Sequence, residues 1–128
     1  MNSPTPPRHR GTRALITGGT QGLGLAVARR LAQEGAEGIV ISGRRAAIGE
    51  AAAAEVRALG AACHYVQADV GRAEDCARLM DTAIQTLGSV NALVNSAATT
   101  DRGSLTETTL EMWQAQFDIN TRGPFLLM

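Results

Sequence analysis

The chain has 128 residues, of which 45% are hydrophobic, and its twelve basic residues balance twelve acidic ones. This length allows one buried core, and the neutral charge argues against nucleic acid as a partner because no basic stripe would neutralise phosphates. No apolar run reaches the roughly 20 residues of a membrane-spanning helix, so we expect a cytoplasmic protein that does not bind membranes.

The first twelve residues contain three prolines and an Arg-His-Arg run, and no apolar stretch follows them. This composition predicts a disordered leader over 1–12 and argues against a signal peptide. Residues 13–128 are expected to form one folded unit. The two cysteines and two histidines lack companions at metal-ligand spacing, so we expect small buried thiols and no metal site.

Strand and helix signals alternate along the folded unit. An apolar strand at about 13–17 leads through a glycine loop into a helix that ends at Gly35. The inward face of this helix is predicted to hold Leu23, Ala26, Val27 and Leu31. The later elements are a strand at 38–42, a helix at about 45–59, a strand at 63–68, a helix at about 73–87 and a strand at 90–94. This pattern predicts an α/β fold, an incomplete Rossmann-like doubly wound parallel sheet of four strands in the order 3-2-1-4 with flanking helices.

A final helix is predicted by Thr108 and Glu111, whose spacing is typical of a capping box. Its inward residues are expected to be Trp113, Phe117 and Ile119. The helical pattern continues to Met128 without a glycine cap or a basic last turn. We therefore expect Met128 to be a truncation point inside a larger domain, and the chain to self-associate or to need a missing C-terminal segment.

A glycine-rich loop joins the first strand to the first helix. Glycine adopts backbone angles that are closed to other residues, and the helix that follows points free N–H groups at a ligand. This order of strand, loop and helix predicts a pocket for a dinucleotide pyrophosphate, although glycine turns also serve plain packing. The candidate binding residues are Gly18, Thr20, Gln21, Gly22, Leu23 and Gly24.

The end of the second strand bears on the choice of cofactor. NAD-binding domains usually place a carboxylate there to bind the ribose hydroxyls, whereas this chain has Ser42-Gly43-Arg44-Arg45. A guanidinium forms charge-assisted bonds with a 2′-phosphate. Arg44 and Arg45 therefore favour NADP(H), with NAD(H) still possible and a solvated helix start as the alternative interpretation.

Four spaced motifs over residues 12–128 resemble the short-chain dehydrogenase/reductase family. The loop Thr17–Gly24 fits that family's Thr-Gly-x-x-x-Gly-x-Gly, and Ala68-Asp69-Val70 matches its adenine-binding aspartate. Asn95-Ser96-Ala97-Ala98 stands where the family has Asn-Asn-Ala-Gly, and Asp118-Ile119-Asn120 matches an asparagine of its catalytic set. The resemblance implies that residues 13–128 are the N-terminal part of a dinucleotide-binding Rossmann domain. It assigns Asp69, Val70, Asn95 and Ala97 to cofactor binding and Asn120 to catalysis.

These matches also have plainer explanations. Asn95 also fits a residue that satisfies local backbone groups at the end of a strand. Asp69 also fits an acidic residue that stabilises the start of a helix through the helix dipole. Pro124 has no N–H to donate to the carbonyl of Asn120, which in the resembled family binds a water that relays protons toward a catalytic lysine. The alternative is a proline kink that serves packing alone.

The proton donor of the resembled family is a tyrosine with a lysine four residues later. This chain has no lysine, and its single tyrosine, Tyr65, lies in the third predicted strand. We therefore expect the cofactor-binding half of an NADP(H)-dependent oxidoreductase for a carbonyl or alcohol substrate, inactive as this chain alone. The alternative is a non-catalytic dinucleotide-binding or interaction module. Either one takes a small-molecule dinucleotide as its partner.

Overall fold

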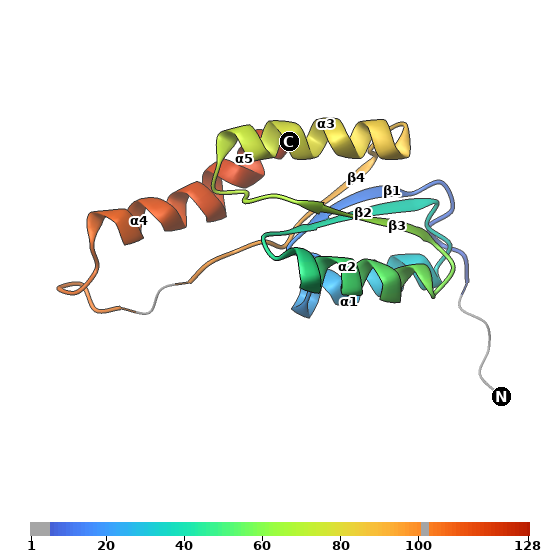
Figure 1. The fold of residues 1–128 in the computed structure, drawn as a ribbon, viewed down its shortest axis with the longest axis horizontal. Coiled ribbons are helices and arrows are strands. Elements are labelled where there is room, and N and C mark those ends of the chain that lie inside the picture. The colour runs from blue at the N-terminus through green and yellow to red at the C-terminus, as the bar shows by residue number, and fades with distance from the viewer. Residues whose placement is uncertain (1–5, 101–102) are drawn as a thin grey trace.

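The computed structural model describes residues 6–100 and 103–128. Strands and helices alternate as the sequence predicts, and Figure 1 shows the strands forming one sheet between two layers of helices. The strands are β1 (Arg13–Thr17), β2 (Gly38–Gly43), β3 (Ala62–Gln67) and β4 (Ala92–Asn95). The helices are α1 (Gly22–Gln33), α2 (Ala46–Arg57), α3 (Ala73–Leu87), α4 (Leu110–Phe117), a π-helix η1 (Asp118–Arg122) and α5 (Gly123–Leu127). None of the described helices has the length and hydropathy that crossing a bilayer requires.

The four strands are parallel, and their order is β3-β2-β1-β4, which confirms the predicted topology. Leu15 of β1 lies in register with Val40 of β2 on one side and with Leu93 of β4 on the other. Helices α1 and α2 cover one face of the sheet, and α3 and α5 cover the opposite face (Figure 1). Because the four strands are parallel, their C-terminal ends lie at the same edge of the sheet.

Two apolar cores lie on the two faces of the sheet because neighbouring side chains of a strand point in opposite directions. The core beneath α1 and α2 contains Ile16, Ile39 and Ile41, while the core beneath α3 contains Leu15 and Val40. Strand β2 is buried from Gly38 to Ser42, as its continuous apolar run predicts. The two cysteines are free and buried, and burial raises the pKa of the Cys63 thiol to about 11.

The buried face of α1 agrees only in part with the predicted one: Val27 and Leu31 pack partly buried against the core, whereas Leu23 and Ala26 are exposed. Leu23 is 75% exposed, and the buried residues are Gly24, Leu25, Ala28 and Ala32. A Cβ atom on Gly24 would lie 2.1 Å from the carbonyl oxygen of Gly18. This close backbone approach turns the helix so that the face centred on Gly24 meets the sheet, and Leu23 consequently points away from it.

The helix predicted over the last twenty residues is divided and begins one residue late. Thr109, rather than Thr108, caps α4, because the hydroxyl of Thr108 donates to the carbonyl of Ser104. Trp113 and Phe117 do not point inward as predicted. They are 50% and 48% exposed and stack on each other with ring centroids 4.3 Å apart. The helix widens to the π form immediately before Pro124, where Gly123 N–H donates to the carbonyl five residues earlier.

Residues 8–12 belong to the predicted leader, yet they have defined contacts. Arg8 and His9 both pair with the carboxylate of Glu34, whose side chain is 2% exposed, and His9 N–H donates to the carbonyl of Glu34. Thr12 accepts backbone hydrogen bonds from Glu37 and Gly38. Residues 8–12 therefore contact the end of α1, where Arg8 pairs with the buried carboxylate of Glu34. Residues 1–5 lie outside the described part of the chain.

Candidate functional site

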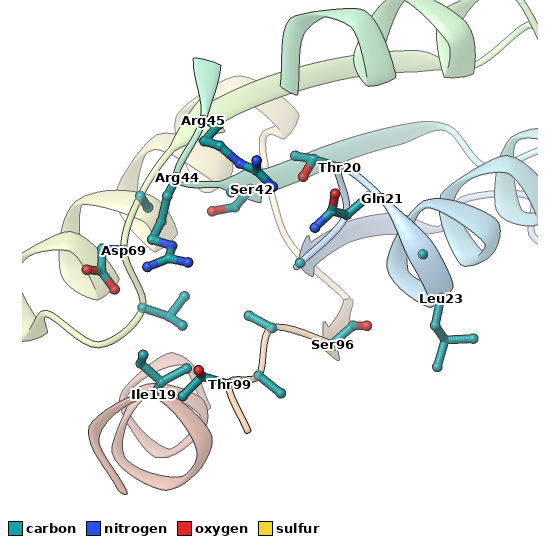
Figure 2. Close-up of a pocket in the computed structure, with 17 residues that line it drawn as sticks. Thr20, Gln21, Leu23, Ser42, Arg44, Arg45, Asp69, Ser96, Thr99 and Ile119 are labelled. Carbon is teal, nitrogen blue, oxygen red and sulfur yellow. The ribbon is translucent and has the colours of Figure 1, made fainter. Parts of the chain in front are cut away.

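A cavity of about 400 Å³ opens at the edge of the sheet where the strands end. Figure 2 shows its seventeen lining residues, which come from the loops after the four strands, the end of β2, the start of α1 and Ile119 of η1. The chain crosses from one side of β1 to the other between β3 and β4, so this edge is a topological switch point. Open α/β sheets bind their ligands at such a point.

Two glycines give the loop after β1 its shape. Gly18 and Gly22 have φ angles of +63° and +56°, in the left-handed region that other residues rarely adopt. A Cβ on Gly18 would lie 2.7 Å from the backbone nitrogen of Ala97, whereas no atom lies within 4 Å of the same position on Gly22. Gly18 therefore packs against the loop after β4, and Gly22 faces open space in the cavity wall.

The N-terminus of α1 forms one wall of the cavity, through Gln21, Gly22 and Leu23. Gln21 is the N-cap in an extended conformation, and its side chain makes no capping hydrogen bond. The first turn of α1 also contains no acidic residue. Its first N–H groups have no helical partner, so they and the positive end of the helix dipole form an anion-binding surface.

The end of β2 brings an unpaired hydroxyl and two cations to the cavity. Ser42 is 1% exposed, and its Oγ atom has no hydrogen-bond partner. Within 6–100 and 103–128, the guanidinium groups of Arg44 and Arg45 make no hydrogen bond or ion pair. Figure 2 shows the Arg44 guanidinium directed into the open space beside Asp69, and that of Arg45 beside Thr20. The strand end is thus strongly basic and rich in free donors.

The backbone at the end of β2 is held from both sides. The hydroxyl of Tyr65 donates to the carbonyl of Gly43 over 2.6 Å, and the methyl group of Thr20 would lie 2.8 Å from a Cβ on Gly43. Thr20 of the glycine loop therefore lies directly against the residue between Ser42 and Arg44. Tyr65 is engaged in this contact at the β3 edge of the sheet, away from β4.

Asp69 and Val70 line the cavity from the loop after β3. Asp69 Oδ1 accepts from the N–H of Gly71 over 2.9 Å, and the N–H of Asp69 donates to Asp75 Oδ2 over 2.8 Å. That backbone hydrogen bond holds the pKa of the Asp75 carboxyl below its usual range. Asp69 therefore belongs to a tight turn. The acidic residues in the first turn of α3 are Glu74 and Asp75, which weakens the interpretation of Asp69 as a helix-dipole partner.

The loop after β4 is tied to β1 and to η1. Ala97 N–H donates to Thr17 Oγ1 over 3.2 Å, and Ser96 N–H donates to the carbonyl of Thr17. The carboxamide of Asn120 accepts from the N–H of Thr99 over 2.9 Å and donates to the Thr99 carbonyl over 2.7 Å. This two-way pairing with the backbone of one residue fixes the loop that forms the cavity wall at Ser96, Ala97, Ala98 and Thr99.

Three of the predicted site residues do not line the cavity. Gly24 packs against Gly18, Asn120 pairs with the backbone of Thr99, and Asn95 is an exposed residue at the end of β4. Side chains at successive positions of an extended chain alternate in direction, so the residue after Asn95 reaches the cavity instead. The remaining predicted binding residues line the cavity together: Gly18, Thr20, Gln21, Gly22, Leu23, Arg44, Arg45, Asp69, Val70 and Ala97.

Several lining residues were not predicted to bind the cofactor, although most of them stand in the motifs that the sequence analysis quoted. They are Ser42, Gly43, Ala68, Ser96, Ala98, Thr99 and Ile119. Most of them end or follow a strand and stand beside predicted site residues in the chain. That position is the signal by which the sequence could have identified them. Ile119 stands next to Asn120 and was predicted to point inward, but the sequence did not place it at the cavity, because a helix that follows the sheet by twenty residues can dock in several ways.

The comparison with known families agrees with the geometry of this site. The family model described as short chain dehydrogenase matches residues 12–128. The chain belongs to the short-chain dehydrogenase family. It is 39% identical over 115 residues to human dehydrogenase/reductase SDR family member 4, covering 89% of this chain and 41% of that protein. It is 36% identical over 118 residues to the NADP-dependent (R)-specific alcohol dehydrogenase of Lentilactobacillus kefiri, covering 92% of this chain and 46% of that enzyme.

Solved structures of this family superpose closely on the chain. A short chain dehydrogenase from Burkholderia cenocepacia in complex with NADP matches with a TM-score of 0.89 and 34% identity, covering 94% of this chain and 49% of that one. A blue fluorescent protein from a metagenomic library in complex with NADPH matches with a TM-score of 0.86 and 35% identity, covering 92% and 49%. The chain therefore spans less than half the length of the relatives that it matches.

Proposed function

We propose that this chain binds NADP(H) and forms the cofactor-binding part of an oxidoreductase that acts on a carbonyl or alcohol substrate. Membership of the short-chain dehydrogenase family supports the reaction class. The similar structures that are described in complex with NADP and NADPH support the type of cofactor. When it is bound, the nicotinamide of such a cofactor donates or accepts a hydride.

The observation that carries the choice of NADP(H) is the group of free donors at the end of β2. A buried hydroxyl without a partner costs free energy unless a ligand accepts from it, and Ser42 Oγ is such a group. Arg44 and Arg45 stand beside it with unpaired guanidinium groups, where an NAD-binding domain usually has a carboxylate. A 2′-phosphate accepts from all three donors through charge-assisted hydrogen bonds.

The other walls of the cavity suit the rest of a dinucleotide. The N–H groups of the first turn of α1 would hold the pyrophosphate, with Gly18 and Gly22 allowing close approach. Asp69 and Val70 would bind the adenine, by resemblance to the family. Ala97 would border the nicotinamide end, which the loop bound to Asn120 encloses.

Arg44→Ala tests this proposal. The loss of a charge-assisted bond costs about 1.5–3 kcal/mol, so NADPH affinity should fall roughly tenfold or more while NADH affinity changes little. Isothermal titration of the 128-residue chain measures both affinities. Arg29→Ala is the matched control, because Arg29 pairs with Glu55 on the surface and does not line the cavity. Equal losses for both cofactors, or no loss for either, would contradict the proposal.

A second candidate is a non-catalytic dinucleotide-binding or interaction module. The chain has no lysine, and its single tyrosine donates its hydroxyl hydrogen to the carbonyl of Gly43 at the β3 side of the sheet. Both candidates bind a dinucleotide, but only the first includes catalysis by the complete protein. If a longer form of the protein reduces a ketone with NADPH and the 128-residue chain does not, the first candidate, the oxidoreductase, is favoured.

A further inference from the structure

The π-helix η1 (Asp118–Arg122) contacts two of the loops that form the cavity. Asn120 pairs with both the backbone N–H and the backbone carbonyl of Thr99, in the loop after β4. Arg122, two residues later, donates from Nη2 to the carbonyl of Gly71 over 2.5 Å, in the loop after β3. Ile119 lines the cavity between them (Figure 2). One short element therefore joins the two walls of the cavity through two neighbouring side chains.

The contact at Gly71 is closely packed on both sides. The N–H of Gly71 donates to Asp69 Oδ1, so both backbone polar groups of this residue are engaged. A Cβ on Gly71 would lie 2.8 Å from the Ile119 side chain. A Cβ on Gly123, the residue after Arg122, would lie 2.5 Å from the carbonyl oxygen of Val70. The start of α5 thus rests directly on the backbone of the loop that carries Asp69 and Val70.

Arg122 is oriented by its own helix. Its Nη1 atom lies 3.3 Å from Asp118 Oδ1, one helical turn earlier, while Nη2 reaches the loop. The side chain is 45% exposed, so the bond to Gly71 is formed at the surface and not in the core. Loss of this bond should consequently loosen the loop without opening a cavity in the apolar core.

We propose that Arg122 is a positioning residue, which holds the loop at Asp69, Val70 and Gly71 in the conformation that binds the adenine end of the dinucleotide. This role rests on the proposed cofactor function. Arg122 acts through Gly71, whose N–H orients the Asp69 carboxylate. Asn120 holds the loop at Thr99 in the same way. Through these two side chains, η1 sets the distance between the cavity walls formed by the loops after β3 and β4.

Titration of the 128-residue chain with NADPH and with adenosine 2′,5′-bisphosphate tests this role. The bisphosphate carries the adenine and the 2′-phosphate but no nicotinamide. Arg122→Ala should weaken the binding of both ligands about fivefold, and Arg122→Lys, which keeps a cationic donor group, should stay within about twofold of the wild type. Arg57→Ala is the matched control, because Arg57 donates to the carbonyl of Cys63 over 2.9 Å and does not line the cavity. This control should leave both affinities unchanged.

Backbone amide hydrogen exchange of the ligand-free chain gives a readout that does not depend on binding. Arg122→Ala should speed exchange at residues 69–72 and leave residues 97–99 unchanged, whereas Asn120→Ala should do the reverse. A merely structural role for Arg122 would raise exchange at both loops equally, and that result would overturn the proposal.

The outcomes separate this inference from the proposed function. If the wild type binds NADPH and Arg122→Ala binds both ligands equally well, the role of Arg122 is overturned and the cofactor function stands. If the wild type binds neither NADPH nor the bisphosphate, the proposed function fails and the adenine-positioning role fails with it. Weaker binding together with faster exchange confined to residues 69–72 supports both.

Discussion

The strands at the centre of the sheet and the strand at its β4 edge differ in how completely their apolar residues are covered. On the side of β2, Ile39, Val40 and Ile41 are fully buried. On the side of β4, Leu93 and Val94 are only partly buried, and among the described strands β4 pairs with β1 alone. Parallel strands are normally covered on both faces, so the β4 side exposes surface that such sheets usually bury.

The helices show the same contrast. Helices α1 and α2 each bury four residues, whereas α4 buries none. Figure 1 shows α4 extending away from the sheet, and Trp113 and Phe117 lie half exposed on it. The side of β1, β2 and β3 supplies its own core and most of the cavity. The side of β4 and α4 presents apolar surface that suits a further partner.

The largest expected effect comes from two leucines that lie opposite each other in the register of β1 and β4. Leu15→Ala should cost about 2–5 kcal/mol of unfolding free energy, because Leu15 is fully buried. Leu93→Ala should cost less than half of that, since its side chain is already partly solvated. Urea denaturation measures both values. Equal costs would show that β4 is covered as well as β1.

The exposed aromatic pair on α4 should drive self-association of the chain. Aromatic residues dominate the energetics of interfaces, so replacing Trp113 and Phe117 by Gln should weaken association roughly tenfold or more. Analytical ultracentrifugation measures the association constant. Leu59→Gln is the control, because Leu59 is 38% exposed beyond the end of α2. A wild-type chain that sediments as a monomer at all concentrations would contradict this prediction.

The smallest expected effect is the pH dependence of stability that the buried carboxylate of Glu34 causes. Glu34 is a buried charged residue at the end of α1. The hydrogen bond from Arg8 and the nearby Arg30 hold the pKa of the Glu34 carboxyl below its usual range. A carboxyl with a lowered pKa in the folded state contributes stability above its unfolded pKa, and this contribution is lost as the pH falls through the folded value. The thermal midpoint of the wild type should therefore fall below about pH 4.5 more steeply than that of Glu34→Gln.

The control for this pH profile is Glu55→Gln, which removes an exposed carboxylate paired with Arg29. Its profile should stay close to that of the wild type, because surface ion pairs contribute little to stability. The comparison is made below pH 5, where the Glu34 carboxylate gains its proton. Parallel profiles of the wild type and Glu34→Gln would show that the cluster at Glu34 does not stabilise the fold.

Much of the fold was predictable because its signals are local. The apolar run at Gly38–Ser42 and the glycine stops at Gly35 and Gly60 mark elements that propensity and periodicity determine. The glycine loop and the absence of a carboxylate after β2 likewise predicted Gly18 and Arg44 at the cavity. Predictions of orientation were less successful. Leu23 was assigned to the wrong face, because a backbone contact between Gly18 and Gly24 sets the rotation of α1.

The sequence by itself determined the order of elements and the chemistry of the strand ends, because both depend on residues that are neighbours in the chain. Only the tertiary structure decided which side chains meet across long separations. Asn120 reaches Thr99, and Arg122 reaches Gly71 across 51 positions, because η1 docks between two loops of the sheet. Likewise, Ser42 becomes a buried and unpaired donor only when β2 lies between β1 and β3, since burial depends on packing rather than on sequence pattern.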